Sequence, residues 1–426
     1  MSKIEKDTVL DVVTCFYLDS RDFNGISASG LTDELGVTWD DLHEVLAESI
    51  EEDIIGVLYS DTELNTHIIR TGFEPKDRQI AKLSTKELHH SCIYPRSTHL
   101  EKVVDRSKYV DRPYVLCLAL GEPQLDYRSF DLSVLEYYRQ EPRYVYKNDD
   151  VRGSISIRDE YYESDQVRES DQILLDTFGF SYDSHFNRAV AVFLRYLANL
   201  SPEHQQVWKA KELTGDYRLH PDYYRNSIIG DWGEGVSIFD AFLTELKVIN
   251  QMAEVMDRPL LFEKDYLKDK PRNFSFLVRP TLEEFNNFVH LLDKMISDNI
   301  NKKFFKKEVP FEEDIKRKDG KIQVQQKGTI TILDDWIRKF YKTHDWNHVD
   351  QMIATFKKIR KVRQTPAHSI HENVFDQKYF KEQRQLIIDA HGAVKTLRMM
   401  FGNHPKVKQK EIEIPDYLSE GKIWTQ

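Results

Sequence analysis

The stretch Pro280-Thr-Leu-Glu-Glu-Phe-Asn-Asn-Phe-Val-His-Leu-Leu-Asp-Lys-Met-Ile296 decides how the C-terminal third of this 426-residue chain folds. Thr281 and Glu284 form a capping box, in which each side chain binds the backbone N–H of the other residue, so we expect a helix to begin here. Apolar residues then recur every three or four positions, which places them on one helical face. That face is formed by Leu282, Phe285, Val289, Leu292 and Ile296. A helix with one apolar face has to be covered by other helices.

Three later segments show the same periodicity, and together with the first they predict a helical bundle over residues 279–405. Their apolar positions are Leu333, Trp336, Ile337 and Phe340; Val349, Met352, Phe356 and Ile359, behind the opening residue Asp345; and Phe380, Ile387, Ala390, Val394, Leu397 and Phe401. Between the first two helices, residues 302–328 are rich in charge and contain Pro310 and Gly320. They predict a basic loop or mobile insertion. The polar tail 406–426 is expected to be peripheral.

Residues 1–75 are predicted to form a winged-helix-like domain. Helices are expected over Val9–Leu18 and Ser29–Leu35, the second ended by Gly36, and a third is capped by Thr38 and runs to about Glu52. Two strands are expected over Ile54–Tyr59 and Thr66–Arg70. The third helix would enter DNA in such a fold, but it carries six carboxylates and no lysine or arginine. Because phosphate attraction dominates DNA affinity, we expect this helix to contact protein instead.

Residues 76–182 predict a mixed α/β region, and residues 183–278 a helical region. In the first, Tyr114–Leu120 is predicted to be a buried strand, Phe130–Tyr138 a short helix, and Tyr144–Tyr146 and Ser154–Ile157 strands. In the second, Ala189–Leu200 and Ile238–Met256 are predicted to be helices. The fold class is therefore mainly α and multidomain, with an N-terminal winged helix, a mixed α/β middle and a C-terminal helical bundle.

Composition limits the class of protein. Hydrophobic residues make up 40% of the chain and charged residues 31%, which is typical of a folded globular protein. The longest apolar run, Tyr114–Leu120, is too short to cross a bilayer, and the first residues contain no apolar signal-peptide core. Three scattered cysteines favour a reducing compartment over a disulfide framework. We therefore expect a cytoplasmic protein that does not bind a membrane.

Charge is unevenly distributed along the chain, although the net charge is −11. Residues 151–176 carry three arginines against seven acids, whereas residues 338–363 carry eight lysines and arginines against two acids. A polyanion is therefore expected to bind only the C-terminal part.

The basic segment ends in Arg363-Gln-Thr-Pro-Ala-His368. An arginine followed after four to six residues by a histidine occurs four times in this chain, about as often as chance supplies, so spacing alone carries no weight. Position separates this pair from the others. Arg363 follows Phe356 by seven residues, which aims it along the apolar seam of the third bundle helix. Pro366 ends that helix, so His368 can turn back towards the same seam.

The four predicted helices, with Arg363 and His368 between the third and the fourth, resemble a HEPN domain over about residues 281–405. That family's signature is an arginine, four to six residues and a histidine. The resemblance implies a metal-independent endoribonuclease without a cofactor, in which two subunits bring their motifs together across a homodimer interface. It also implies an effector of a prokaryotic toxin, abortive-infection or other antiviral defence system. Active members often carry Asn, Asp or His after the arginine, where this chain has Gln364.

The chemistry of the pair suits RNA cleavage. Arg363 can hold a phosphate through two hydrogen bonds and stabilise developing charge, and His368 can transfer protons near neutral pH. Lys357, Lys358, Arg360 and Lys361 would attract the RNA backbone. Gln364 and His371 are possible auxiliary residues. The N-terminal region is a possible site for a regulatory protein partner.

Three other interpretations stay open at the sequence level. Arg363 can pair with an acid while His368 only caps the fourth helix, which would leave a catalytically silent assembly or sensor protein. The winged helix can make the chain a DNA-binding transcriptional regulator. His89, His90 and Cys92, with His99 downstream, might suggest a metal, but they lack a second regularly spaced pair, so we expect no metal site.

Overall fold

In the computed structural model the chain divides into two compact units, one of residues 1–184 and 188–231 and one of residues 185–187 and 232–426. The structure describes residues 4–84, 90–162, 164, 167–231, 235–316, 322–364, 372–410 and 412–426. Helices predominate over strands in these ranges, as expected from the sequence. The division at about residue 231 falls inside the predicted helical region 183–278.

The first part of the N-terminal unit combines helices with a small antiparallel sheet of strand order β1-β3-β2. Its elements are α1 (Lys6–Asp19), β1 (Ile26–Ser27), α2 (Ala28–Leu35), α3 (Trp39–Glu51), β2 (Ile55–Leu58), α4 (Lys76–Leu83) and β3 (Cys92–Pro95). The expected caps are present. Gly36 adopts the left-handed conformation at the end of α2, and Thr38 forms a capping box with Asp41 at the start of α3. The three helices therefore begin and end close to where local sequence signals place them.

The second strand of this sheet is not where the sequence places it. Thr66–Arg70 was predicted to pair with β2, but β3 does so, with Val57 opposite Ile93. Thr66 instead donates its hydroxyl proton to the carbonyl of His90, and Ile69 binds the side chain of Gln124. The sheet thus extends past the predicted boundary at residue 75. Strand partners are chosen by tertiary packing, which a local pattern does not contain.

A larger antiparallel sheet of strand order β4-β8-β7-β6-β5 follows, with β9 paired to β7. Its strands are β4 (Tyr127–Phe130), β5 (Tyr144–Asn148), β6 (Arg152–Ile157), β7 (Leu174–Tyr182), β8 (Arg188–Phe193) and β9 (Arg218–Leu219). The surrounding helices are α5 (Ser97–Val103), α6 (Pro113–Ala119), α7 (Val134–Arg139), α8 (Leu194–Ala198), α9 (Pro202–Lys209) and α10 (Pro221–Tyr224), with short helical turns at Arg106–Tyr109, Glu169–Asp171 and Arg225–Ile229. The predicted strands at Tyr144 and Ser154 are confirmed.

Two assignments in this region are wrong, and both concern short apolar runs. Tyr114–Leu120 was expected to be a strand, but it lies in α6, where Pro113 occupies the first turn, a favoured helix position for proline. Ala189–Leu200 was expected to be one helix, but its first half is β8, buried on both sides, and only its second half is helical. A run that is apolar on every face has no period that distinguishes helix from strand. Phe130 likewise ends β4 rather than starting a helix.

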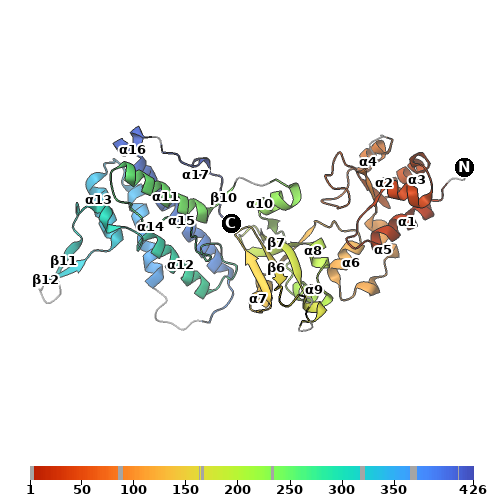
Figure 1. Ribbon diagram of the computed structural model, residues 1–426, viewed down its shortest axis with the longest axis horizontal. Helices are drawn as coiled ribbons and strands as arrows, with labels where there is room; N and C mark the ends of the chain where they lie inside the picture. The colour runs from red at the N-terminus through yellow and green to blue at the C-terminus, as the bar shows by residue number, and fades with distance from the viewer. Residues whose placement is uncertain are drawn as a thin grey trace. The chain divides into compact units, whose positions relative to one another are not determined.

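The C-terminal unit is built on long helices (Figure 1). They are α11 (Ile238–Val255), α12 (Leu282–Ile296), α13 (Thr329–Phe340), α14 (Asn347–Gln364) and α15 (Gln377–Gly402). Helix α15 packs against α11, α12 and α14, and its predicted apolar face from Phe380 to Phe401 is buried. The four helices predicted from periodicity are therefore present. Helix α11 belongs to the same unit, so the predicted boundary at residue 279 lies too far along the chain.

Two peripheral segments are more ordered than expected. Residues 302–328 were predicted to be a loop, but they contain the turn Lys302–Phe305 and the antiparallel strands β11 (Glu312–Lys316) and β12 (Ile322–Gln326), which extend away from the helices in Figure 1. The tail contains α16 (Pro405–Gln409), α17 (Asp416–Glu420) and β13 (Ile423–Trp424), which pairs in parallel with β10 (Val236–Ser237). Leu418 is buried, so the tail is part of the unit.

A buried charge lies between α11 and α15. The carboxylate of Glu245 is fully buried, and the guanidinium of Arg398, which is 8% exposed, donates a hydrogen bond to its Oε2 atom. The Nε2 atom of His391 lies 4.0 Å from the Oε1 atom of Glu245. Removing one partner from such a pair leaves an uncompensated charge in a medium of low dielectric constant.

We expect Arg398→Met to lower the free energy of unfolding by about 3–5 kcal/mol, the usual cost of breaking a buried ion pair. Lys395→Met removes a half-exposed charge from the same helix and should cost less than about 1 kcal/mol. The double variant Glu245→Met/Arg398→Met should recover most of the loss. Urea unfolding measures all three, and a loss below about 1 kcal/mol for Arg398→Met would show that Glu245 does not depend on this arginine.

Burial, with smaller contributions from Lys395 and Arg398, lowers the pKa of His391 to about 4. Below pH 6.5, the ordinary pKa of histidine, His391 is protonated in the unfolded chain but stays neutral in the folded chain. The free energy of unfolding therefore falls as the pH drops from about 6.5 to about 4. Between pH 7 and 4.5 we expect the natural protein to lose about 2 kcal/mol more than His391→Gln. Equal losses in urea unfolding would contradict this assignment.

Candidate functional site

Arg363 lies one residue before the C-terminal end of α14. The buried face of this helix comprises Val349, Met352, Ile353, Phe356 and Ile359, and Arg363 continues it by helical spacing. The side chain points to α12, where its Nη1 atom lies 2.5 Å from Oδ2 of Asp293 and 3.3 Å from Oδ2 of Asp298. An arginine on an apolar seam needs a partner or a ligand, and the two carboxylates supply a partner.

The main partner, Asp293, was not singled out from the sequence. It is 1% exposed on the apolar face of α12, next to Leu292. The hydroxyl of Ser297 donates to its Oδ1 atom at 2.6 Å, so both carboxylate oxygens have a partner. A lone acid on an otherwise apolar helical face is the sequence signal that could have found it, because a buried carboxylate requires a cation. Asp298 lies in the turn two residues beyond the end of α12 and is more exposed.

The ion pairs occupy one end of the Arg363 guanidinium. Hydrogen bonding to Asp293 raises the pKa of Arg363 despite partial burial, so the side chain is always charged. Its Nε and Nη2 atoms have no hydrogen-bond partner among the described residues. These two nitrogens form the fork that holds phosphate or carboxylate by two parallel hydrogen bonds. The Arg363 side chain is 29% exposed, so part of it is accessible to solvent.

The histidines predicted to complete the site, His368 and the auxiliary candidate His371, lie outside the described residues. Gln364, the other auxiliary candidate, is the last residue of α14 and is exposed. The structure thus describes two of these four predicted residues, Arg363 and Gln364.

The four predicted RNA-binding side chains lie on α14 before Arg363. Lys357 and Lys358 are more than half exposed, and Lys358 lies 3.1 Å from Asp389. Lys357 is only loosely placed near Asp334, at 3.7 Å. Lys361 is exposed, and Arg360 is half-buried beside the apolar face. By helical spacing Arg360 lies about 60° around the axis of α14 from Arg363, whereas Lys357, Lys358 and Lys361 lie roughly 120–160° from it.

The three other pairs with the same spacing have different surroundings. Arg338 is exposed and binds Asp334 at 2.7 Å and Asp350 at 2.6 Å. Arg384 donates to the carbonyl of Thr425 at 2.7 Å, and Arg398 is the buried partner of Glu245. Each of these three arginines thus has a clear structural partner. Arg363 differs because it lies at the end of a helix and its Nε and Nη2 atoms have no hydrogen-bond partner among the described residues.

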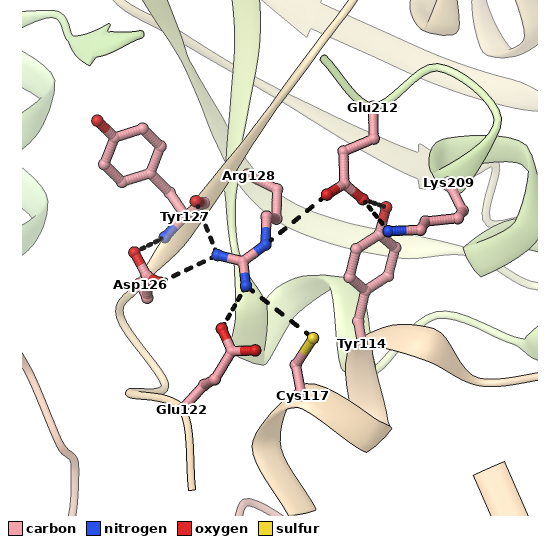
Figure 2. A network of polar contacts seen from close by, with 8 residues as sticks. All are labelled: Tyr114, Cys117, Glu122, Asp126, Tyr127, Arg128, Lys209 and Glu212. Carbon is pink, nitrogen blue, oxygen red and sulfur yellow. Dashed lines mark hydrogen bonds and ion pairs between the residues drawn. The ribbon is translucent and has the colours of Figure 1, made fainter. Parts of the chain in front are cut away.

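Figure 2 shows a second polar cluster, in the N-terminal unit. Arg128 on β4 contacts the carboxylates of Glu122 and Asp126, the latter at 3.0 Å, and lies 3.8 Å from Glu212, which also accepts from Tyr114 and Lys209. The Sγ atom of Cys117 faces the same guanidinium. Burial, followed by the charge of Glu122, raises the pKa of Cys117 to about 11, so the thiol stays protonated at neutral pH. This excludes a thiolate nucleophile here and favours a role in tying β4 to α6 and α9.

The histidines and the cysteine that might suggest a metal site make other contacts where the structure describes them. Cys92 is buried, with its Sγ atom 3.4 Å from Nδ1 of His67 and 3.3 Å from the hydroxyl of Thr66. His99 faces the Thr14 hydroxyl at 3.1 Å, and His89 lies outside the described residues. Over the ranges that the structure describes, no group of three or more histidine, cysteine and acidic side chains is arranged to hold a metal.

Comparison with protein-family models, with curated proteins and with solved structures finds no match to this chain. Within the part of the chain that the structure describes, no helix has the length and apolar character needed to cross a membrane.

We expect Arg363→Met to lower the free energy of unfolding by about 2–4 kcal/mol, because Asp293 would stay buried with only Ser297 as a partner. Asp298→Asn should change stability by less than about 1 kcal/mol, since Asp298 is exposed. Arg360→Met is the matched control. Arg360 lies on the same helix but forms no ion pair with Asp293 or Asp298, so its loss should be close to neutral. A neutral Arg363→Met in chemical denaturation would mean that the fold does not depend on the ion pair between Arg363 and Asp293.

Proposed function

We propose that the C-terminal helical unit cuts RNA as a metal-independent endoribonuclease, with Arg363 holding the phosphate and His368 transferring protons. The proposal rests on the resemblance described above and on one structural observation. The Nε and Nη2 atoms of Arg363 have no hydrogen-bond partner among the described residues, while its Nη1 atom is bound by Asp293 and Asp298. An arginine fixed at one end loses little conformational freedom when its other end binds a phosphate.

The reaction that suits these groups is transesterification. The 2′-hydroxyl of the RNA attacks the adjacent phosphorus and loses its proton to a base, and the bond from phosphorus to the 5′-oxygen breaks as that oxygen takes a proton from an acid. The products are a 2′,3′-cyclic phosphate and a 5′-hydroxyl, with no metal or redox step. His368 would supply proton transfer, and Arg363 would stabilise the extra negative charge on the phosphate oxygens.

The local charge sets a requirement on RNA binding. Arg363 with Asp293 and Asp298 carries a net charge of −1, which repels a phosphate. Asp298 is the carboxylate that can give way, because it is 47% exposed and lies farther from Nη1 than the buried Asp293. Arg360, one helical turn before Arg363, and the exposed Lys357 and Lys361 elsewhere on α14 would supply the attractive field. A second copy of the chain, as the resemblance implies, would add another arginine and histidine to the site.

A second candidate is a catalytically silent assembly or sensor protein. It is favoured by the same ion pair, because a buried Asp293 explains Arg363 without any ligand. A DNA-binding regulator has less support. Helix α3 exposes Asp40, Glu44, Glu48 and Glu51, and Lys6 pairs with Glu48 and Glu52 at its C-terminal end, so this face is acidic.

Incubation of the purified protein with tRNA and total RNA in EDTA tests the proposal. We expect fragments with 2′,3′-cyclic phosphate ends and a roughly 10²–10⁴-fold lower cleavage rate for His368→Ala, a typical loss for a proton-transfer residue. Arg363→Lys keeps the charge but not the fork, and should also cut more slowly.

The matched controls are Arg338→Ala and His344→Ala, a pair with the same spacing whose arginine is bound by Asp334 and Asp350. They should cut like the natural protein. Equal rates for His368→Ala, Arg363→Lys and these controls would reject Arg363 and His368 as the site and favour the assembly role.

A further inference from the structure

A separate cavity of about 590 Å³ lies in the C-terminal unit, where the C-terminal ends of α11, α13 and α15 meet the start of α16. This volume is in the range of small-molecule sites. Its wall is aromatic: Trp336, Phe340, Tyr341 and Phe401 contribute to it. Phe340 is 46% exposed, and its ring lies 5.5 Å from the Trp336 ring, so part of the aromatic wall is accessible to solvent.

The charge of this cavity is positive. Lys342 and Lys408 line it, are exposed, and have no ion-pair partner among the described residues. None of the described lining residues carries a carboxylate. Arg258 also lines the cavity, but Glu308 neutralises it through two hydrogen bonds of 2.9 and 3.1 Å. The free charge is therefore that of two lysines beside an aromatic wall.

This combination points to one kind of ligand. Aromatic side chains with an open face stack on nucleobases, and such stacking tolerates any base. Lysine ammonium groups bind phosphate as point charges. An apolar anion with a flexible tail would need a deep channel rather than a flat, partly exposed ring. We propose that the cavity binds a nucleotide unit, with its base against Phe340 and Tyr341 and its phosphate at Lys342 and Lys408.

The cavity is distinct from the proposed ribonuclease site. Lys342 precedes the first residue of α14, and Arg363 lies sixteen residues after that first residue, Asn347. At 1.5 Å per residue the helix separates the two places by about 24 Å. The inference therefore does not rest on the proposed function. A nucleotide unit can come from a free nucleotide or from an RNA strand, and the chemistry of recognition is the same.

Isothermal titration of the full-length protein with AMP, adenosine and inorganic phosphate tests the proposal. We expect AMP to bind more tightly than either fragment, and its affinity to fall as salt is raised. Phe340→Ala and Lys408→Gln should each weaken AMP binding, by roughly tenfold and by a few fold respectively. Lys410→Gln is the matched control, because Lys410 follows Lys408 on the same segment outside the cavity, and it should bind like the natural protein.

Two further comparisons decide the source and the independence of the site. A single-stranded tetraribonucleotide, titrated into His368→Ala, would bind more tightly than AMP if strands are the natural ligand, and more weakly if free nucleotides are. Arg363→Lys should leave AMP binding unchanged. The proposal is overturned if AMP does not bind, whether or not dodecanoate does, or if phosphate alone binds as well as AMP. It is also overturned if Phe340→Ala folds normally and still binds AMP normally.

Discussion

The ion pair between Asp293 and Arg363 determines how the end of α14 is held. Asp293 is buried on α12 and cannot be accommodated as an anion without a cation within reach, and Arg363 is the cation that the packing of α14 on α12 provides. The same pair fixes one end of the guanidinium and leaves the other open. The packing of α14 and the proposed chemistry therefore depend on the same contact. Asp293 holds Arg363 in place and also determines which of its nitrogens are left to bind a phosphate.

A second buried carboxylate, Glu245, is paired in the same way with Arg398 between α11 and α15. Two of the helix contacts in the C-terminal unit thus include a buried carboxylate that is paired with an arginine of the facing helix. Apolar surface alone allows helices to slide past each other, whereas a buried ion pair is satisfied in one register. One pair therefore favours a single register of α14 on α12, and the other favours a single register of α15 on α11.

The site could be predicted only in part from the sequence. Helical spacing from Phe356 correctly aimed Arg363 at the apolar seam, because the period of a helix is a local property. The identity of its partner was missed, although an acid within the apolar face of α12 was a usable signal. Asp293 and Arg363 are 70 residues apart, and no local pattern states which helices will meet. The cavity beside Phe340 was missed for the same reason, since its wall combines the ends of helices that are distant in sequence.

What the sequence determined by itself was the set of long helices with one apolar face and a clear cap, such as α3, α12 and α15, because periodicity and capping act between near neighbours. It also placed β5 and β6 by their alternation. What only the tertiary structure decided was the state of segments without a period and the choice of partners: Tyr114–Leu120 became helical, the start of Ala189–Leu200 became a central strand, and β3 replaced Thr66–Arg70 in the first sheet. Such segments gain their stability from distant residues that cover them, so their conformation is set by the packing and not by their own order of residues.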